Sequence, residues 1–379
     1  MEFQALNIEE IGARIELTSF HAGEVTEFHA MLHVDPRGEV FADQLSRIQR
    51  AEQHLKALDI MAGAKAVFKR YFLSDATNQV PVISEDDQCT ISYIQQPPLD
   101  GSKLAIWLYL QRGTDICNVN ESTVVTHNGY RHIWTMGLIN NTADTSYMQT
   151  WKTLFTYIDI LKMFNATLEA NCIRTWFFVR DVDTQYNGLV KSRRECFVEQ
   201  GLTPDTHYIA STGIGGNPAD PKALVQLGSY AMTGFQPQQQ RYLYALTHLN
   251  RTIEYGVTFE RGTLMQYGDR NHVYISGTAS INNKGEVLHV GDIEGQTRRM
   301  WENVEKLLEE GGMDWGDVMQ IIVYLRDGAD YQMVKNLFEE KFPHIPYVIT
   351  LAPVCRPTWL IEMECVAVKA AHNEQFRNF

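Results

Sequence analysis

The sequence predicts an α+β protein built from three similar units in one chain, a pseudo-trimer whose first unit is degenerate. In each third of the chain a glutamine opens a helix of i, i+3, i+4 apolar periodicity. A β-rich strand ending in an aspartate follows, and a strand of alternating apolar residues closes the unit. The spacing is 31, 32 and 31 residues, from Gln44 to Asp75, from Gln149 to Asp181 and from Gln296 to Asp327.

Each unit is expected to begin with a strand, a turn and a second strand. The first unit has EFHAMLHVDPRGEVF at 27–41, and the third has YISGTASINNKGEVL at 274–288. The segments DPRGEV and NNKGEV align, and both place a glycine where a hairpin requires a positive φ. We therefore expect a β-hairpin across each of these two segments.

A second helix is predicted in two of the three units, at TQYNGLVKSRRECFVEQG and at YQMVKNLFEEKFP. The first unit has the shorter TNQVPVISEDDQ there, which makes it degenerate. The closing strands are KLAIWLYL at 103–110, KALVQLGSYAM at 222–232 and WLIEMECVAV at 359–368. Helices on one sheet face leave the other face to be covered by neighbouring units. We place the units at 1–115, 116–240 and 241–379.

The charge, the apolar runs and the cysteine spacing argue against several classes of function. The formal charge of −13 and the pI of about 5.4 argue against a nucleic-acid partner, because phosphate binding depends on Lys and Arg. The chain lacks an apolar run of the roughly 20 residues that span a bilayer, so we expect a cytoplasmic protein without a membrane partner. The six cysteines form no CxxC pair. We expect neither a metal nor a cofactor.

The third unit carries SGTASI, a Q-x3-M-x2-N-V-x3-L helix and the closing IEMECVAV. This combination resembles the YjgF/RidA (reactive intermediate deaminase) superfamily, whose members form trimers of chorismate-mutase-like subunits with ligand clefts between them. The resemblance implies three RidA-like units in one chain, with clefts that are free to diverge. Such a chain is expected to be a monomeric pseudo-trimer, and its further association stays open.

A closer resemblance covers residues 120–370 and is to the chorismatases, RidA-related hydrolases that remove the enolpyruvyl group of chorismate. The matching stretches include IRTWFFVRDV, YIASTGIGG, EYGVTFERGT, YISGTASINNKGEVLHVGDIEGQT and VCRPTWLIEME. One departure is Trp176-Phe177-Phe178, where the family usually has Trp-Asn-Tyr. Two products stay open, a hydroxybenzoate or a dihydroxycyclohexadiene acid, each formed together with pyruvate.

Two carboxylates, Glu362 and Glu364, lie on one face of the last closing strand, because side chains two apart point the same way. We align them with Ile106 and Leu108 of the first unit, so this face is not expected to be simply solvent-exposed. The chorismatase resemblance implies that the glutamate seven residues after Cys355, Glu362, is the catalytic acid. Burial would raise its pKa and keep it protonated. Glu364 is expected to support it.

A dianionic substrate such as chorismate needs cations and backbone donors around it. The glycine-rich YIASTGIGG at 208–216 suits a carboxylate lodged close to the backbone. Arg261 is a weaker candidate. The expected substrate-binding residues are Arg174, Arg193, Tyr208, Ser211, Thr212, Gly213, Cys355 and Arg356.

The expected partner is a small-molecule carboxylate, and two functions stand beside the hydrolase. One is a RidA-type enamine or imine deaminase, although the arginine that such deaminases carry soon after a proline is absent from IPYVITL, TPDTHYIAS and VPVISEDDQ. The other is a non-catalytic protein that binds small molecules, because fold does not fix function. Ribonuclease activity, a label sometimes given to the superfamily, is disfavoured by the acidic charge.

Overall fold

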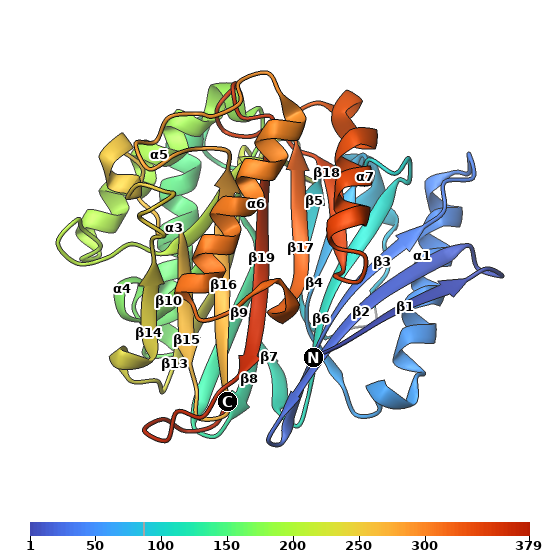
Figure 1. Ribbon diagram of the computed structural model, residues 1–379, viewed down its shortest axis with the longest axis horizontal. Coiled ribbons are helices and arrows are strands. Elements are labelled where there is room, and N and C mark those ends of the chain that lie inside the picture. The colour runs from blue at the N-terminus through green and yellow to red at the C-terminus, as the bar shows by residue number, and fades with distance from the viewer. Residues whose placement is uncertain (86–87) are drawn as a thin grey trace.

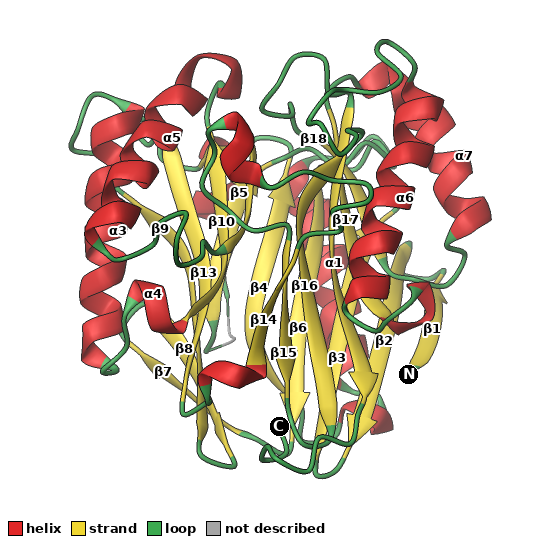
Figure 2. Ribbon diagram, turned by 60° about the vertical axis from the view of Figure 1, so that its left-hand side comes forward, coloured by secondary structure: helices red, strands yellow, loops and turns green. Residues whose placement is uncertain are grey.

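Three mixed β-sheets, one in each third of the chain, stand side by side around a common axis, with the long helices on the outside (Figures 1 and 2). The computed structural model describes residues 1–85 and 88–379. The arrangement confirms the predicted α+β class and the three similar units in one chain. Each sheet therefore has one face towards its own helices and one towards the other two units.

The first sheet has the strand order β1-β2-β3-β6-β4-β5-β12. Its strands are β1 (Glu2–Ile8), β2 (Ala13–Ala22), β3 (Val25–Val34), β4 (Lys65–Leu73), β5 (Thr90–Gln95), β6 (Leu104–Arg112) and β12 (Asn217–Pro218). Helix α1 (Phe41–Lys56) covers it, with η1 (Asp59–Met61) following. Only α2 (Ala76–Gln79) and η2 (Val80–Val82) stand where a long second helix could lie, so the first unit is degenerate. Residues 86–87 of TNQVPVISEDDQ lie outside the described residues.

The second sheet has the order β11-β10-β13-β9-β8-β7, and the third β14-β15-β16-β19-β17-β18. The elements of the second unit are β7 (Asp115–Val119), β8 (Ser122–His127), β9 (Tyr130–Ile139), α3 (Ser146–Met163), α4 (Leu168–Asn171), β10 (Cys172–Val179), α5 (Val182–Glu199), β11 (Ala210–Gly215) and β13 (Val225–Thr233). Those of the third are η3 (Pro237–Gln239), β14 (Gln240–Leu243), η4 (Thr252–Tyr255), β15 (Gly262–Gln266), β16 (Arg270–Ala279), α6 (Ile293–Glu310), η5 (Trp315–Asp317), β17 (Val318–Leu325), η6 (Gly328–Asp330), α7 (Tyr331–Lys341), β18 (Tyr347–Leu351) and β19 (Ile361–Ala370).

The hairpin predicted in the first unit is wrong, and the one predicted in the third unit is reduced to an isolated antiparallel bridge around the expected turn. Strand β3 ends before Pro36, which cannot donate to a sheet, and the chain then loops into α1. In the third unit an isolated bridge joins Ile281 to Val287 around a turn closed by the Asn282 side chain. The regular hairpins are the preceding pairs, β2–β3 and β15–β16. The aligned glycines do have the predicted positive φ, at +68° for Gly38 and +75° for Gly285.

The three helix-opening glutamines make the same contact in every unit. Each is the fourth residue of its helix, and its side-chain oxygen accepts the backbone N–H of the residue just before the closing strand. The bonds join Gln44 to Lys103 at 2.8 Å, Gln149 to Leu224 at 2.7 Å and Gln296 to Leu360 at 2.9 Å. This contact explains why the glutamine recurs, and it fixes how the units align.

The alignment of the first closing strand was predicted one residue out of register. Ile106 and Leu108, expected to match the two glutamates of the third unit, belong to the core beneath α1. Their neighbours Ala105 and Trp107 face the axis and are the true equivalents of the glutamates. A slip of one residue turns every side chain of a strand to the other face. The face that carries the glutamates is therefore the face between the units.

A shared core fills the axis between the sheets. Trp107, Trp134, Trp176, Tyr230 and Tyr274, from all three units, belong to it. The rings of Trp134 and Tyr230 stack with their centroids 4.1 Å apart. The neighbouring units thus cover the inner face of each sheet, as predicted.

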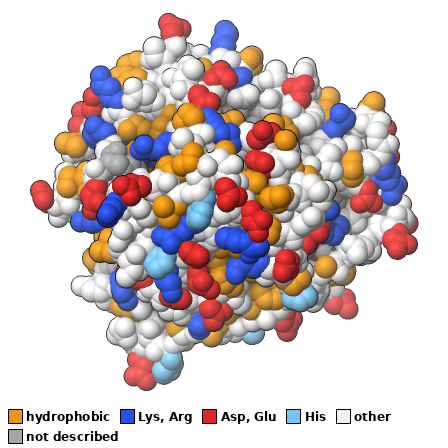
Figure 3. Space-filling view, turned by 45° about the horizontal axis from the view of Figure 1, so that its top comes forward, with side chains coloured by type: hydrophobic (Ala, Val, Ile, Leu, Met, Phe, Trp, Pro, Cys, Tyr) orange, Lys and Arg blue, Asp and Glu red, His pale blue; other side chains and the backbone are white. Residues whose placement is uncertain are grey.

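Acidic and basic side chains are interspersed on the face shown in Figure 3. None of the helices in the described part of the chain has an apolar stretch long enough to cross a membrane.

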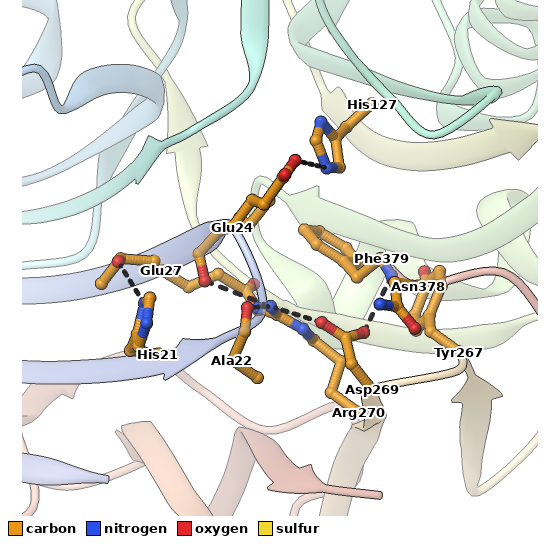
Figure 4. A network of polar contacts seen from close by, with 12 residues as sticks. His21, Ala22, Glu24, Glu27, His127, Tyr267, Asp269, Arg270, Asn378 and Phe379 are labelled. Carbon is orange, nitrogen blue, oxygen red and sulfur yellow. Dashed lines mark hydrogen bonds and ion pairs between the residues drawn. The ribbon is translucent and has the colours of Figure 1, made fainter. Parts of the chain in front are cut away.

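Polar contacts join the first and third units at one end of the axis (Figure 4). Arg270 of β16 donates to Glu27 of β3 at 2.7 Å and to the carbonyl of Ala22 at 2.6 Å. The neighbouring Asp269 accepts the backbone N–H of Phe379 at 2.8 Å. These buried contacts fix how two sheets that are distant in sequence meet.

Candidate active site

A small cavity lies between the second and third units. Its volume is about 30 Å³, close to the share of one water molecule in the liquid. The second unit supplies Tyr186, Arg193, Ser211 and Gly213 to its wall. The third supplies Val257, Phe259, Arg261, Gly277, Ala279, Ile281, Cys355, Arg356, Trp359 and Glu362. We call this space the Glu362 cavity.

Glu362 is held in the cavity wall by the sheet. On β19 it lies opposite Tyr324 of β17 and Ala279 of β16, and it is 4% exposed. Among the described residues its carboxyl has no hydrogen-bond or ion-pair partner. It lies against Gly277, where a Cβ would collide with Oε1 of Glu362. The glycine therefore makes the room in which the carboxyl sits.

The surroundings of Glu362 favour its protonated form. Burial raises its pKa, the neighbouring charge of Glu364 raises it further, and the result is about 8 despite opposing effects of Arg261 and Arg174. At neutral pH the group is mostly a carboxylic acid. A protonated carboxyl in a secluded site can donate a proton to a bound molecule.

Glu364 is held very differently, although it points to the same face of β19. Its Oε2 accepts from Nη2 of Arg174 at 2.7 Å and from the hydroxyl of Thr212, and its Oε1 accepts from Nε1 of Trp176 at 2.8 Å. Arg70 of the first unit lies 3.5 Å from Oε1. Glu364 is thus a structural carboxylate that joins all three units.

Arg193 brings an unused donor to the cavity. It is a buried residue of α5, and its Nε donates to the hydroxyl of Thr258 at 3.1 Å. Its Nη2 has no hydrogen-bond partner among the described residues. Buried polar groups are nearly always paired, so a buried guanidinium nitrogen without a partner is prepared for an acceptor such as a carboxylate.

Two further arginines line the cavity from the third unit. Arg261 donates to the carbonyl of Asn250 at 3.2 Å, and Arg356 lies over the ring of Trp359, 5.3 Å from its centroid. With Arg193 they give the wall three cations around one carboxylic acid. An anionic ligand is the kind of molecule that this wall favours.

Cys355 is a neutral part of the wall. Burial raises the pKa of its thiol to about 12, and the charge of Glu362 adds to that effect. The thiolate, which is the nucleophilic form, is therefore scarce at neutral pH. The arrangement provides an acid and cations rather than a covalent nucleophile.

The predicted site residues divide into two groups. The cavity wall includes Arg193, Ser211, Gly213, Cys355, Arg356 and Glu362. Arg174 and Thr212 instead lie behind it, bonded to Glu364. Tyr208 lies outside the wall, with its N–H bonded to Glu260 and its ring stacked on Phe197.

Sequence reasoning missed several wall residues. Tyr186 stands on α5 seven residues before Arg193, hence on the same face, a periodicity that could have found it. Its ring occupies the space that a side chain at Gly213 would need. Gly277 lies within a break in the regular pairing of β16 with β19, between Ile275 and Thr278, and the sequence gives no signal for such a bulge.

Comparisons with known proteins agree with this architecture. Residues 264–369 match the family described as Endoribonuclease L-PSP. The 3-aminoacrylate deaminase RutC of Acinetobacter baylyi is 35% identical over 100 residues, which are 26% of this chain and 79% of that protein. The 3-hydroxybenzoate synthase of Streptomyces hygroscopicus is 26% identical over 232 residues, 56% of this chain and 68% of that one.

A crystal structure of a chorismatase has the same fold. Its TM-score is 0.62 at 16% identity, over 80% of this chain and 93% of that one. The 35% identity to RutC, over 79% of that protein, shows that the chain belongs to the YjgF/RidA superfamily. Its fold is shared with the chorismatase structure.

Proposed function

We propose that this protein is a hydrolase that removes the enolpyruvyl group of chorismate, with Glu362 as the general acid. The observation that carries the proposal is the unpaired, buried carboxyl of Glu362, protonated at neutral pH and surrounded by arginines. The similarity to a 3-hydroxybenzoate synthase and the shared chorismatase fold support the choice of chorismate.

Binding would rest on the arginines of the wall. Chorismate carries two carboxylates and an enol ether, and a guanidinium can bind a carboxylate through two parallel hydrogen bonds. Nη2 of Arg193, from the second unit, has no hydrogen-bond partner among the described residues, and Arg356 of the third unit also lines the cavity. Held by both units, the substrate would present its vinyl carbon to Glu362.

The reaction then follows from one proton transfer. The O–H of Glu362 breaks and its proton forms a new C–H bond at the vinyl carbon, which leaves an oxocarbenium ion on the ether carbon. Water adds to that carbon, and its surplus proton returns to the Glu362 carboxylate. The hemiketal then collapses: its hydroxyl gives up a proton as the C=O of pyruvate forms, the ring oxygen takes up a proton as the ether C–O bond breaks, and pyruvate and a ring alcohol leave.

The cavity must widen before this substrate can enter. A volume of about 30 Å³ holds a water molecule, whereas pockets for small ligands measure about 300–1,000 Å³. Its outer wall comes from loop residues that include Val257, Arg356 and Trp359, outside the regular strands. Movement of these loops is the route of entry that the proposal requires.

The test is to incubate the purified chain with chorismate and measure pyruvate. We expect pyruvate release that falls about 10²–10⁴-fold in Glu362→Gln, which keeps the shape of the side chain and removes its acid. Glu340→Gln, on the exposed face of α7, is the matched control and should keep full activity. No pyruvate above background, or full activity in Glu362→Gln, would reject the mechanism.

A second candidate is a RidA-type deaminase, favoured by the 35% identity to RutC over 100 residues. Its test is ammonia release from 2-aminoacrylate and 3-aminoacrylate by the same preparation. Ammonia without pyruvate would replace the hydrolase proposal. A rise in melting temperature with chorismate, without turnover of any of these compounds, would instead indicate a non-catalytic binding protein.

A further inference from the structure

We infer that Arg70, supplied by the degenerate first unit, is a positioning residue of the Glu362 cavity that balances the negative charge of Glu362 once its proton has left. The inference rests on the proposed function, because it concerns the acid of that reaction. It also assigns the first unit a part in a cavity to which it contributes no wall residue.

Arg70 is a fully buried cation with few partners. It stands on β4 with its guanidinium close to the rings of Trp107, Trp176 and Phe178, at 5.2, 5.0 and 5.0 Å from their centroids. Its closest charged neighbour is Oε1 of Glu364, at 3.5 Å. Its Nε, Nη1 and Nη2 have no hydrogen-bond partner among the described residues. A buried charge in this state costs free energy unless another charge offsets it.

The net charge of the buried group shows when the positive charge of Arg70 is offset. The buried group consists of Arg70, Arg174, Glu362 and Glu364. While Glu362 keeps its proton these four residues carry one net positive charge, and when the proton leaves they are neutral; Arg193 and Arg261 of the cavity wall add their own positive charges to this count. The two glutamates lie about 7 Å apart along the strand, close enough for charges to interact in a buried site. Arg70 therefore favours the deprotonated form of Glu362.

The other groups that face Glu362 are three neutral groups and the cations that act beside Arg70. Burial raises the pKa of Tyr186 and of Tyr324 well above the usual value and raises that of Cys355 to about 12, so all three stay neutral. Arg174 is paired with Glu364 and Arg261 is bonded to Asn250, yet both keep their charge and lower the pKa of Glu362. Arg193 and Arg356, also in the wall, would be engaged by the substrate in the proposed reaction.

The position is specific to the first unit. Arg70 pairs with Trp107 across the sheet, and the equivalent pairs are Trp176 with Gly228 and Ile322 with Glu364. Only one of three equivalent positions thus carries a cation. That cation faces the one closing strand that has acids.

The experiment measures the ionisation of Glu362 directly, in the ligand-free full chain. Infrared difference spectra between each protein and its Glu362→Gln counterpart, with ¹³C-labelled glutamate, follow the carboxyl band as a function of pH. Arg70→Met should move the midpoint about one pH unit higher, as expected for the loss of a charge about 10 Å away in a buried site. Arg70→Gln should move the midpoint in the same direction. Arg70→Lys, which keeps the positive charge, should return the midpoint most of the way to its wild-type value.

The matched control is Arg112→Met, which removes an arginine from the same sheet that is bonded to Ile60 and Thr26 instead. It should leave the midpoint unchanged. A midpoint in folded Arg70→Met or Arg70→Gln that stays in place or moves lower would overturn the inference.

Turnover separates this inference from the proposed function. If chorismate is hydrolysed, Arg70→Met should lower kcat several-fold at neutral pH and move the alkaline limb of the pH profile upward, whereas a merely structural defect would lower kcat without moving the limb. If the wild type releases no pyruvate, the proposed function fails and the infrared titration still decides the role of Arg70.

Discussion

Glu362 and Glu364 stand two residues apart on one strand, and their surroundings give them different chemistry. Glu364 is surrounded by donors from two arginines, a threonine and a tryptophan. Glu362 has none among the described residues, so desolvation dominates and it keeps a proton. Two neighbouring carboxyls, one held by donors and the other kept protonated, are a common basis for acid catalysis.

The first prediction concerns stability. The pKa of Glu362 is raised from that of an unfolded chain, about 4.3, to about 8 in the folded protein. Between these values the folded state binds more protons than the unfolded state, so this group lowers stability as the pH rises. Glu362→Gln should therefore stabilise the protein at pH 8 by about 1–3 kcal/mol, and less at pH 5.

Urea unfolding of both proteins at pH 5 and pH 8 measures this difference. Equal stability at pH 8 would mean that the carboxyl is ionised without cost, against the basis of the proposed mechanism. Glu340→Gln on the exposed face of α7 is the control and should leave stability within about 0.5 kcal/mol at both pH values.

The second prediction concerns Gly277. A Cβ at this position would collide with Oε1 of Glu362, which is the free end of a side chain and can move aside. Gly277→Ala should thus change stability by no more than about 1 kcal/mol while lowering pyruvate release about 10²-fold, because a misplaced acid loses its alignment. Gly328→Ala, whose Cβ would meet only the end of the Leu99 side chain, is the matched control. Normal activity of Gly277→Ala would show that the observed carboxyl position is not the working one.

How far the site could be predicted depended on the kind of signal. Glu362 could be predicted from the sequence because an acid on an alternating apolar strand is unusual. Arg193 could be predicted because it lies on a predicted helix. Arg174 and Thr212 have the right chemistry for substrate binding, yet their donors are directed to Glu364. No pattern in one sequence reveals which buried carboxylate an arginine will meet across two units.

At the scale of elements, the repeated glutamine contact yields the third prediction. Gln296 holds the backbone of Thr358 and Leu360 at 3.0 and 2.9 Å, just before the strand that carries Glu362. Gln296→Leu removes both bonds, together with the bond to the carbonyl of His289 at 3.2 Å, and leaves buried backbone groups unpaired, at a cost of about 1–3 kcal/mol. Because the loosened segment adjoins the cavity, we also expect pyruvate release to fall at least tenfold at a temperature where the protein is folded.

Gln44→Leu is the matched control in the first unit. It breaks the equivalent bond, to the backbone N–H of Lys103, and because Gln296 makes two further bonds it should lower the free energy of unfolding less than Gln296→Leu does, with little effect on catalysis. Thermal unfolding and pyruvate assays of both variants measure the two effects. If Gln44→Leu impairs catalysis as much as Gln296→Leu, the contact supports the whole molecule rather than the segment next to Glu362.

The elements that the sequence predicted well are those whose periodicity is marked. The helices and closing strands were found because each has a distinct apolar repeat, and the degenerate first unit because its second helix is missing. The register of the first closing strand was missed because Ala105, Ile106, Trp107 and Leu108 are all buried. A strand buried on both faces reads as a continuous apolar run and hides which residues face the axis.

At the scale of the whole molecule, a single chain allows the three equivalent junctions between its units to carry different residues. Between the first and second units, Gln226, which is equivalent to Glu362, donates to the hydroxyl of Ser92 at 2.9 Å. A cleft of about 610 Å³, lined by residues that include His33 and Asp100, lies where the third unit meets the first. At this junction the residue equivalent to Glu362 is Ala105. Of the three equivalent positions, only the junction of the second and third units carries the carboxyl.

The last prediction concerns the contact between the first and third units shown in Figure 4. Burial alone would raise the pKa of Glu27, but His272 and Arg270 outweigh it and hold that pKa well below its usual range. A depressed pKa contributes stability that is present above about pH 4.3, the unfolded value, and is lost as the pH falls below it. Glu27→Gln leaves Arg270 without its buried partner and should cost about 3–5 kcal/mol at pH 7.

The same change should also flatten the acid side of the stability profile, since the group that takes up a proton is gone. Urea unfolding at pH 7, 5 and 3 measures both effects. Glu24→Gln, on the same hairpin, is the control, because Glu24 is exposed and reaches only His127 at 3.7 Å. Its stability should stay within about 0.5 kcal/mol of the wild type. A loss equal to that of Glu27→Gln, or none in either protein, would show that the units are held together by the aromatic core on the axis and not by this ion pair.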